Sequence, residues 1–162
     1  MKNLLVGLLL TLSFIGCSEE VAAPVESKVV VGKSLAALSL NDQFEKKHTL
    51  NADTKTVIFA FSKDMGHMSN EFFEKKGSDY LSSHNAVFVA DVSGAPSLIR
   101  SMFIMPGLKD FKHTVLIIED KQIAASYRNE AKKEQVMIVK LNNLVIEHIS
   151  YVSSAKELEE AI

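Results

Sequence analysis

The chain has 162 residues, with 18 Lys and Arg against 20 Asp and Glu, and its formal net charge is −2. This near-neutral, slightly acidic balance lacks the basic surface that nucleic acid binding requires, so nucleic acid is excluded as a partner. The length corresponds to one domain with a sizeable core.

The first residues form an export signal. Lys2 precedes an apolar run over residues 4–15, and the chain turns polar directly after Gly16-Cys17. The run is shorter than the ~20 residues that a membrane-spanning helix needs. The Gly16-Cys17 ending resembles the signal of bacterial lipoproteins, although Phe14 stands where that family more often has leucine. A plain secretory signal with a chance cysteine and an uncleaved anchor are the alternatives.

The lipoprotein resemblance implies cleavage after Gly16, acylation of Cys17 and the lipid bilayer as a partner. It also implies more than one acyl chain, which a stable anchor requires. Ser18, by the sorting habit of many Gram-negative lipoproteins, implies the outer membrane, with the domain facing the periplasm. Cys17 is the only cysteine, so the chain makes no internal disulfide. We therefore divide the chain into a signal peptide (1–16), a lipidated tether (17–28) and one domain (29–162).

Strands and helices alternate along the predicted domain. Apolar runs rich in β-branched and aromatic residues predict strands, and the run at 56–61 is typical of a strand buried on both faces. The predicted strands are residues 29–31, 38–40, 48–50, 56–61, 86–92, 114–118, 136–141 and 144–149. The predicted helices run from the N-cap Ser69 to Tyr80 and Leu81, over residues 97–103, and from Ser153 or Ser154 to Ile162.

Turn and cap residues separate these elements. Asparagine and aspartate tolerate turn backbones, and Glu157 is placed to complete a capping box. The predicted turns are Asn41-Asp42, Met105-Pro106-Gly107 after the second helix, and Asn142-Asn143 in a hairpin. Residues 126–135 are polar and predict a loop.

Strand, helix and strand over residues 56–92 predict a right-handed βαβ unit, and the whole order predicts a mixed central sheet with helices on both faces. This order resembles the thioredoxin-like superfamily, in particular its periplasmic tethered-reductase and peroxiredoxin-like branches. The resemblance is carried by residues 32–40, 41–50, 56–62 and 87–92 and covers residues 31–162. It implies an α/β fold, a thioredoxin-like three-layer sandwich.

The redox motif of that superfamily is missing. The place of its Cys-x-x-Cys, where the helix N-terminus activates a thiol, is occupied by Asp64-Met65-Gly66-His67, give or take one residue. The place of its cis-proline is Lys112-His113-Thr114, where a trans bond is expected because a non-proline cis bond costs ~2.5–4 kcal/mol. We therefore expect no enzymatic activity and exclude thiol–disulfide exchange and peroxidase activity in particular.

Three functions fit these residues. The first is a membrane-anchored envelope lipoprotein with a redox-inactive domain that binds or assembles an envelope protein partner and needs no cofactor. The second is an envelope copper(I)-binding protein that uses Met65, His67 and Met68, because thioether and imidazole ligands suit copper. The third is an enzyme with a non-thiol site near Asp64 and His67, which lie three residues apart at a helix start. Met102, Met105 and His113 belong to segments expected near the same face.

Overall fold

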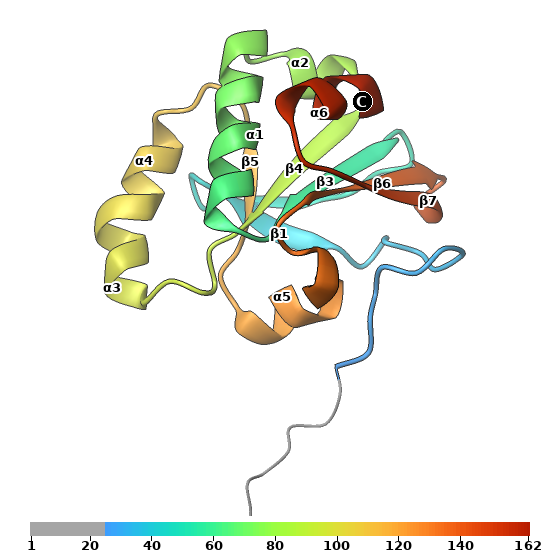
Figure 1. Cartoon of the computed structure of the whole chain (residues 1–162), viewed down its shortest axis with the longest axis horizontal. Coiled ribbons are helices and arrows are strands. Elements are labelled where there is room, and N and C mark those ends of the chain that lie inside the picture. Colours follow the sequence, from blue (N-terminus) through green and yellow to red (C-terminus); the bar gives the residue numbers. More distant parts are fainter. Residues whose placement is uncertain (1–24) are drawn as a thin grey trace, which may run out of the picture.

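The structure is a computed structural model, and it describes residues 25–162. Cys17 and the predicted signal lie outside the described residues. The domain consists of one seven-stranded sheet in the order β2-β1-β5-β4-β3-β6-β7, with helices on both of its faces (Figure 1). The strands are β1 (Ser39–Asp42), β2 (Lys47–Thr49), β3 (Thr56–Ala60), β4 (Ala86–Asp91), β5 (Val115–Ile118), β6 (Val136–Asn142) and β7 (Val145–Val152).

The helices are of unequal length. They are α1 (Lys63–Lys76), α2 (Tyr80–Ser83), α3 (Ser97–Ile99), the π-helical η1 (Arg100–Ile104), α4 (Met105–Lys109), α5 (Lys121–Tyr127), the 3₁₀ turn η2 (Glu130–Lys132) and α6 (Ala155–Ala161). None of the helices within residues 25–162 is long and apolar enough to cross a membrane.

The centre of the sheet is parallel, as predicted. β3 pairs in parallel with β4, and β4 with β5, while β1, β6 and β7 run antiparallel to their neighbours. All five residues of β3 are buried, because the sheet is covered on both faces. The carboxyl ends of β3 and β4 therefore meet at one edge, beside the start of α1.

Each face of the sheet carries its own core. On one face α1, α4 and α6 pack over Phe73, Phe88 and Leu158, all fully buried. On the other face α5 and residues 35–40 pack over Phe59 and Val139. A buried side chain of this size contributes about 1.5–3 kcal/mol, so both layers are needed for stability. The mixed sheet between two helical layers confirms the predicted α/β fold class.

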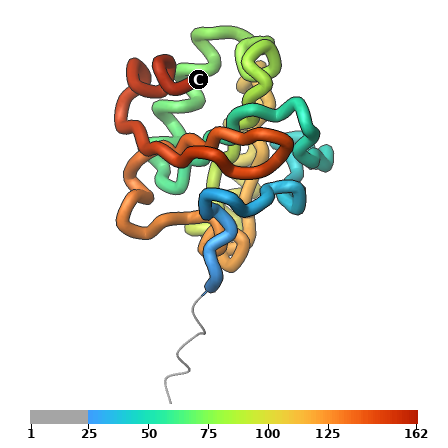
Figure 2. The backbone as a smooth tube through the Cα atoms, turned by 90° about the vertical axis from the view of Figure 1, so that its right-hand side faces the viewer, coloured from blue at the N-terminus to red at the C-terminus, as the bar shows by residue number. Residues whose placement is uncertain are grey.

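The N-terminal segment differs from the prediction of a strand at residues 29–31. Val30 and Val31 are exposed, and the backbone pairs further on, where the amide of Gly32 donates to the carbonyl of Ile146 over 2.8 Å. Figure 2 shows this segment beside the β6–β7 hairpin. Three consecutive valines fit a strand by composition, but no strand within residues 25–162 pairs with them.

Two predicted turns are displaced. Asn41 and Asp42 belong to β1, and the turn is formed by residues 43–46, because the Asp42 carboxylate accepts from two of its amides, those of Phe44 and Lys46. In the β6–β7 hairpin the two positive-φ residues are Asn143 and Leu144 rather than Asn142 and Asn143. The one-residue shift lets Leu144 pack against the core.

The first predicted helix start is also wrong. α1 is capped by Ser62, whose hydroxyl accepts from the Met65 amide, so the N-cap lies seven residues before the predicted one at Ser69. Ser69 lies in the helix interior and is fully buried. The helix ends at Gly77, where φ is +97°, and α2 is a separate turn rather than its continuation.

Two further segments are more helical than predicted. Met105-Pro106-Gly107 does not close a helix, because the preceding turn is π-helical and the Met105 amide bonds to the carbonyl of Arg100, so Pro106 falls in the first turn of α4. The helix α5 was not predicted, and it takes in the beginning of the expected loop at residues 126–135. The final helix is confirmed, with Ser154 as its N-cap and the Glu157 carboxylate on the Ser153 amide.

Candidate functional site

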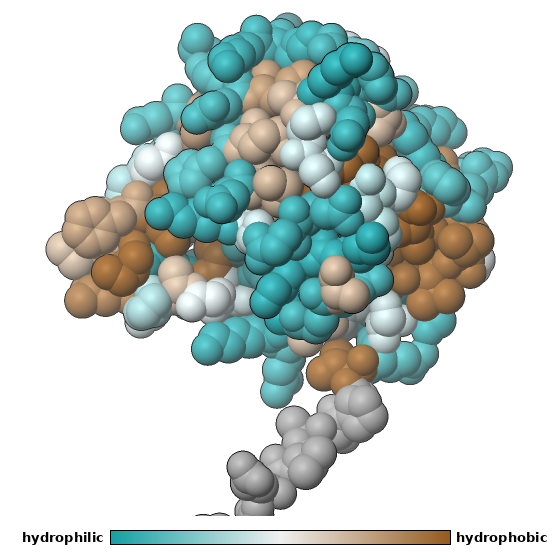
Figure 3. Space-filling model, in the orientation of Figure 1, coloured by the Kyte–Doolittle hydropathy of each residue, from teal (hydrophilic) through white to brown (hydrophobic). Residues whose placement is uncertain are grey.

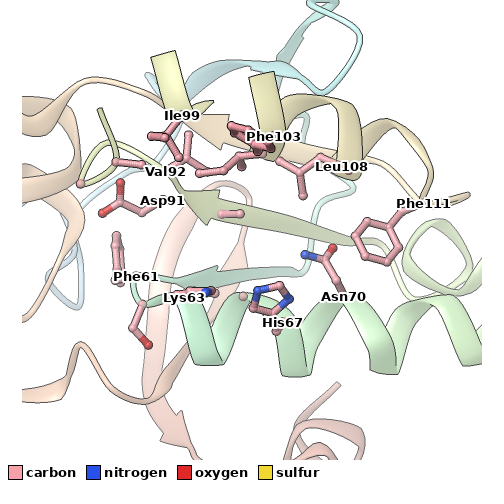
Figure 4. A pocket seen from close by; sticks show the side chains of 18 of the residues that line it. Phe61, Lys63, His67, Asn70, Asp91, Val92, Ile99, Phe103, Leu108 and Phe111 are labelled. Atoms are coloured by element: carbon pink, nitrogen blue, oxygen red, sulfur yellow. The ribbon is translucent and has the colours of Figure 1, made fainter. Parts of the chain in front are cut away.

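A cavity of about 790 Å³ opens at the carboxyl ends of β3 and β4, between α1 and the helical segment 97–109 (Figure 4). Its floor is formed by Ala60 and Ala90, the last residue of β3 and the next-to-last residue of β4. The volume lies within the ~300–1,000 Å³ of small-molecule sites, and the carboxyl edge of an α/β sheet is where such sites occur. We therefore take this cavity, called the pocket below, as the candidate site.

The α1 wall of the pocket is polar. Lys63, His67 and Asn70 all line it, and their spacing of four and three residues puts them on one face of the helix. In Figure 4 these side chains point from α1 into the pocket. The early start of α1 at Ser62 is what brings this row to the carboxyl edge of the sheet.

The opposite wall is apolar. Ile99, Phe103 and Leu108 line the pocket from α3, η1 and α4. Ile99 and Phe103 also face solvent, and they continue into Leu98 and Met102, so four large apolar side chains that are 42–65% exposed gather at one rim. Figure 3 shows apolar surface over this part of the molecule. Exposed apolar surface of this kind marks interaction sites.

Glycines keep the pocket open. Gly66 of α1, Gly107 of α4 and Gly94 all line it, and a Cβ added at any of them would meet no heavy atom within 4 Å. Glycine inside a helix costs roughly 0.5–1 kcal/mol relative to alanine. Glycine at positions 66 and 107 therefore lowers the stability of α1 and α4, although the space beside each residue would accommodate a side chain.

One end of the pocket holds an ion pair. Asp91 ends β4, and its carboxylate accepts from the Ser93 amide over 2.8 Å and from Arg128 Nη1 over 3.2 Å. Its side chain is only 3% exposed, and the Arg128 guanidinium also contacts Glu130. The negative charge of Asp91 is thus compensated within the domain.

A buried histidine supports the wall from behind. His113 is 1% exposed, lies among the rings of Phe73, Phe88 and Phe111, and places Nε2 at 2.9 Å from Oδ1 of Asn70. Burial lowers the pKa of His113, against the opposing influence of the Glu74 carboxylate. The ring is therefore neutral at pH 7, and Nε2 carries its proton, because an amide oxygen only accepts.

The sequence-predicted residues separate in the structure. His67 lines the pocket, whereas Asp64 is exposed outside it and His113 lies behind Asn70. Met65 and Met68 pack against the core, and Met105 does the same, while Met102 is exposed. Within residues 25–162 no three His, Cys, Asp or Glu side chains are grouped as metal ligands would be. The peptide bonds at His113 are trans, as expected.

Sequence reasoning missed Lys63, Asn70, Asp91 and Arg128 as lining residues. Lys63 and Asn70 share a helix face with His67, so a helix start placed at Ser62 would have found them. Asp91 is the last residue of β4, and the carboxyl end of a parallel strand is a common place for functional polar residues. No sequence pattern around Arg128 indicates its role, because folding brings it beside Asp91, which is distant in the sequence.

Comparison with known proteins supports the fold alone. No protein-family model matches the chain, and no curated protein sequence matches it. The domain has a thioredoxin-like fold, which it shares with solved structures of low sequence identity. A "putative protein disulfide isomerase" from Bacteroides thetaiotaomicron is 12% identical with a TM-score of 0.50, over 86% of this chain and 94% of that one. A peroxiredoxin-like protein from Aquifex aeolicus is 10% identical with a TM-score of 0.50, over 85% and 91%.

These neighbours correct one expectation. The chain was expected to have no enzymatic activity, but the solved structures that share its fold are titled a putative protein disulfide isomerase and a peroxiredoxin-like protein, and these titles contradict that expectation. The expectation rested on the missing cysteines at one helix start. A missing thiol says nothing about other catalytic groups that the same fold can hold at this edge of its sheet.

Proposed function

We propose that the chain is an envelope lipoprotein whose thioredoxin-like domain binds an apolar ligand in the pocket between α1 and residues 97–109. The observation that carries this proposal is an open cavity of about 790 Å³ whose lining is mostly apolar. Binding of an apolar ligand to such a cavity is favoured by about 25 cal/mol for each Å² of apolar surface that is removed from water.

The rim of the pocket supports the same function. Phe103 is 65% exposed and Ile99 is 42% exposed, although both face the pocket. A ligand that enters the pocket covers these side chains as well as its own apolar surface. Apolar surface of the ligand and of the pocket rim is removed from water together. We therefore expect the burial of apolar surface to drive binding, and we expect affinity to depend on the free volume of the pocket.

The anchored part of the proposal rests on the sequence. Acylation of Cys17 would tie the domain to a membrane through the tether at residues 17–28, and Ser18 favours the outer membrane with the domain in the periplasm. A module that binds an envelope partner and an enzyme with a non-thiol site beside His67 would both bind a ligand in the pocket. We therefore propose ligand binding, which both functions require.

A pocket-filling variant tests the proposal. N-phenyl-1-naphthylamine is a neutral apolar probe whose fluorescence rises in apolar sites, and we expect the purified chain to bind it. Gly66→Leu places a side chain into the open space and should abolish this binding, whereas Ala155→Leu adds a comparable side chain at an exposed position of α6 and should not. Equal binding by both variants would show that the probe sits elsewhere and would refute the proposal.

A further inference from the structure

The donor groups on the α1 wall are unused within the domain. Among residues 25–162, no hydrogen bond or ion pair engages the Lys63 ammonium, the His67 ring or the amide nitrogen of Asn70. They follow each other along one helix face, and four residues of helix advance the row by about 6 Å. A ligand in the pocket therefore meets several donors along one of its sides.

Asn70 gives the strongest indication of what the ligand carries. The residue is 4% exposed, and its oxygen lies 2.9 Å from His113 Nε2, so the oxygen is the atom of the amide that faces away from the pocket. Figure 4 shows the amide nitrogen directed into the pocket. The amide nitrogen is not one of the buried polar atoms that lack a partner, so it is reached from the open pocket and is free to donate to a ligand oxygen there.

The charge of the pocket favours an anion. Lys63 lies in the first turn of α1, a 14-residue helix whose N-terminus is electrically positive. Asp91 is the one carboxylate among the lining residues, and Arg128 compensates its charge. An anionic group beside Lys63 and Asn70 thus meets cations and donors without an opposing free carboxylate.

The opposite wall selects a hydrocarbon rather than a peptide. Ile99, Phe103 and Leu108 offer no hydrogen-bond acceptor from their side chains, and β3 and β4 are paired on both edges within the sheet. An extended peptide would leave its amide N–H groups without partners against this wall. A hydrocarbon chain has no such groups.

Resting on the proposed function, we infer that the pocket binds an apolar carboxylate, a chain of fatty-acid type. Its carboxylate lies against Lys63 and the Asn70 amide, with His67 beside it, and its chain lies against Phe103 and Leu108. Each contact is a hydrogen bond or an apolar packing contact, and no covalent step is involved.

Two ligands of equal chain length test this inference. Dodecanoate and dodecanol are used to displace N-phenyl-1-naphthylamine from the purified chain below their micellar concentrations. We expect dodecanoate to bind at least tenfold more tightly, a difference of about 1.4 kcal/mol. Lys63→Met and Asn70→Asp should each remove this preference, because the first loses the cation and the second replaces the donor while keeping an acceptor for His113. Lys75→Met, on the exposed end of the same helix, should keep it.

The outcomes separate the two claims. A preference for dodecanoate that Lys63→Met abolishes supports the carboxylate site. Equal affinity of the two ligands, or a preference that survives both variants, overturns the inference and leaves the apolar pocket in place. Displacement of the probe by an apolar peptide but by neither ligand also overturns it. If the probe itself does not bind to the pocket, the inference and the proposed function fail together.

Discussion

Replacing Gly66 with alanine should stabilise the domain, and this follows directly from the open pocket. Gly66 has an ordinary helical backbone in α1, and a Cβ built on it meets no heavy atom within 4 Å. Alanine avoids the backbone entropy that glycine loses in a helix, so the free energy of unfolding should rise by about 0.5–1 kcal/mol. For a domain of this size the melting temperature should rise by roughly 2–3 °C.

Urea unfolding followed by circular dichroism measures the change. With m-values of about 1–3 kcal/mol/M, the midpoint should move upward by roughly 0.2–1 M at an unchanged m-value. Gly77→Ala is the matched control, because its Cβ also meets no atom within 4 Å but its φ is +97°. That conformation is unfavourable for alanine by about 1–3 kcal/mol, so this variant should be destabilised. Destabilisation by Gly66→Ala would mean that the space beside α1 is filled in solution, and it would refute the reasoning.

Three further predictions follow from buried groups and from Cys17. Ser69→Ala should raise the free energy of unfolding by about 1 kcal/mol, because the buried Ser69 hydroxyl finds no hydrogen-bond partner among residues 25–162 and alanine favours the helix. A lower free energy of unfolding in urea would contradict this. His113 has a pKa lowered by burial, so the unfolded chain binds the proton more readily than the folded one below about pH 6.5. Stability is therefore fully present above that pH and should fall as the pH drops toward 5, and His113→Phe should flatten this slope in unfolding curves measured at each pH. Cys17→Ser should abolish incorporation of labelled palmitate in cells and release the protein from the membrane fraction; membrane retention of the variant would count against acylation at this residue.

The central sheet was predictable because its strands are determined by composition. The run at 56–61 is almost wholly apolar, and β3 is buried on both faces as such runs are. The final helix was equally accessible, since Ser154 and Glu157 form a local capping pattern. Local rules sufficed wherever a residue's neighbours in sequence are also its structural partners.

Errors arose where distant residues decide the structure. Ser69 has the chemistry of an N-cap, yet it is buried in the middle of α1, because Ser62 directly after β3 caps the helix. The helix α5 is short, and its signals, the cap Asp120 and the spacing of Ala124 and Tyr127, lie within a polar segment.

The pocket lay furthest from what sequence could show. His67 was identified as a candidate residue, but its partners were sought in Asp64 and two methionines that face elsewhere. The pocket depends on Gly66 and Gly107 lining one cavity from two helices, and this apposition exists only in the folded domain. A single glycine in a helical segment carries no information about what lies across from it.

Binding in the pocket is tested most directly by methyl NMR of the purified chain during titration with dodecanoate. The account predicts that the methyl signals of Ile99, Ile104 and Leu108 shift first and together, and that Gly66→Leu abolishes these shifts. Shifts confined to methyl groups outside the pocket, such as that of Met137 on the other face of the sheet, would contradict it, as would an unchanged spectrum.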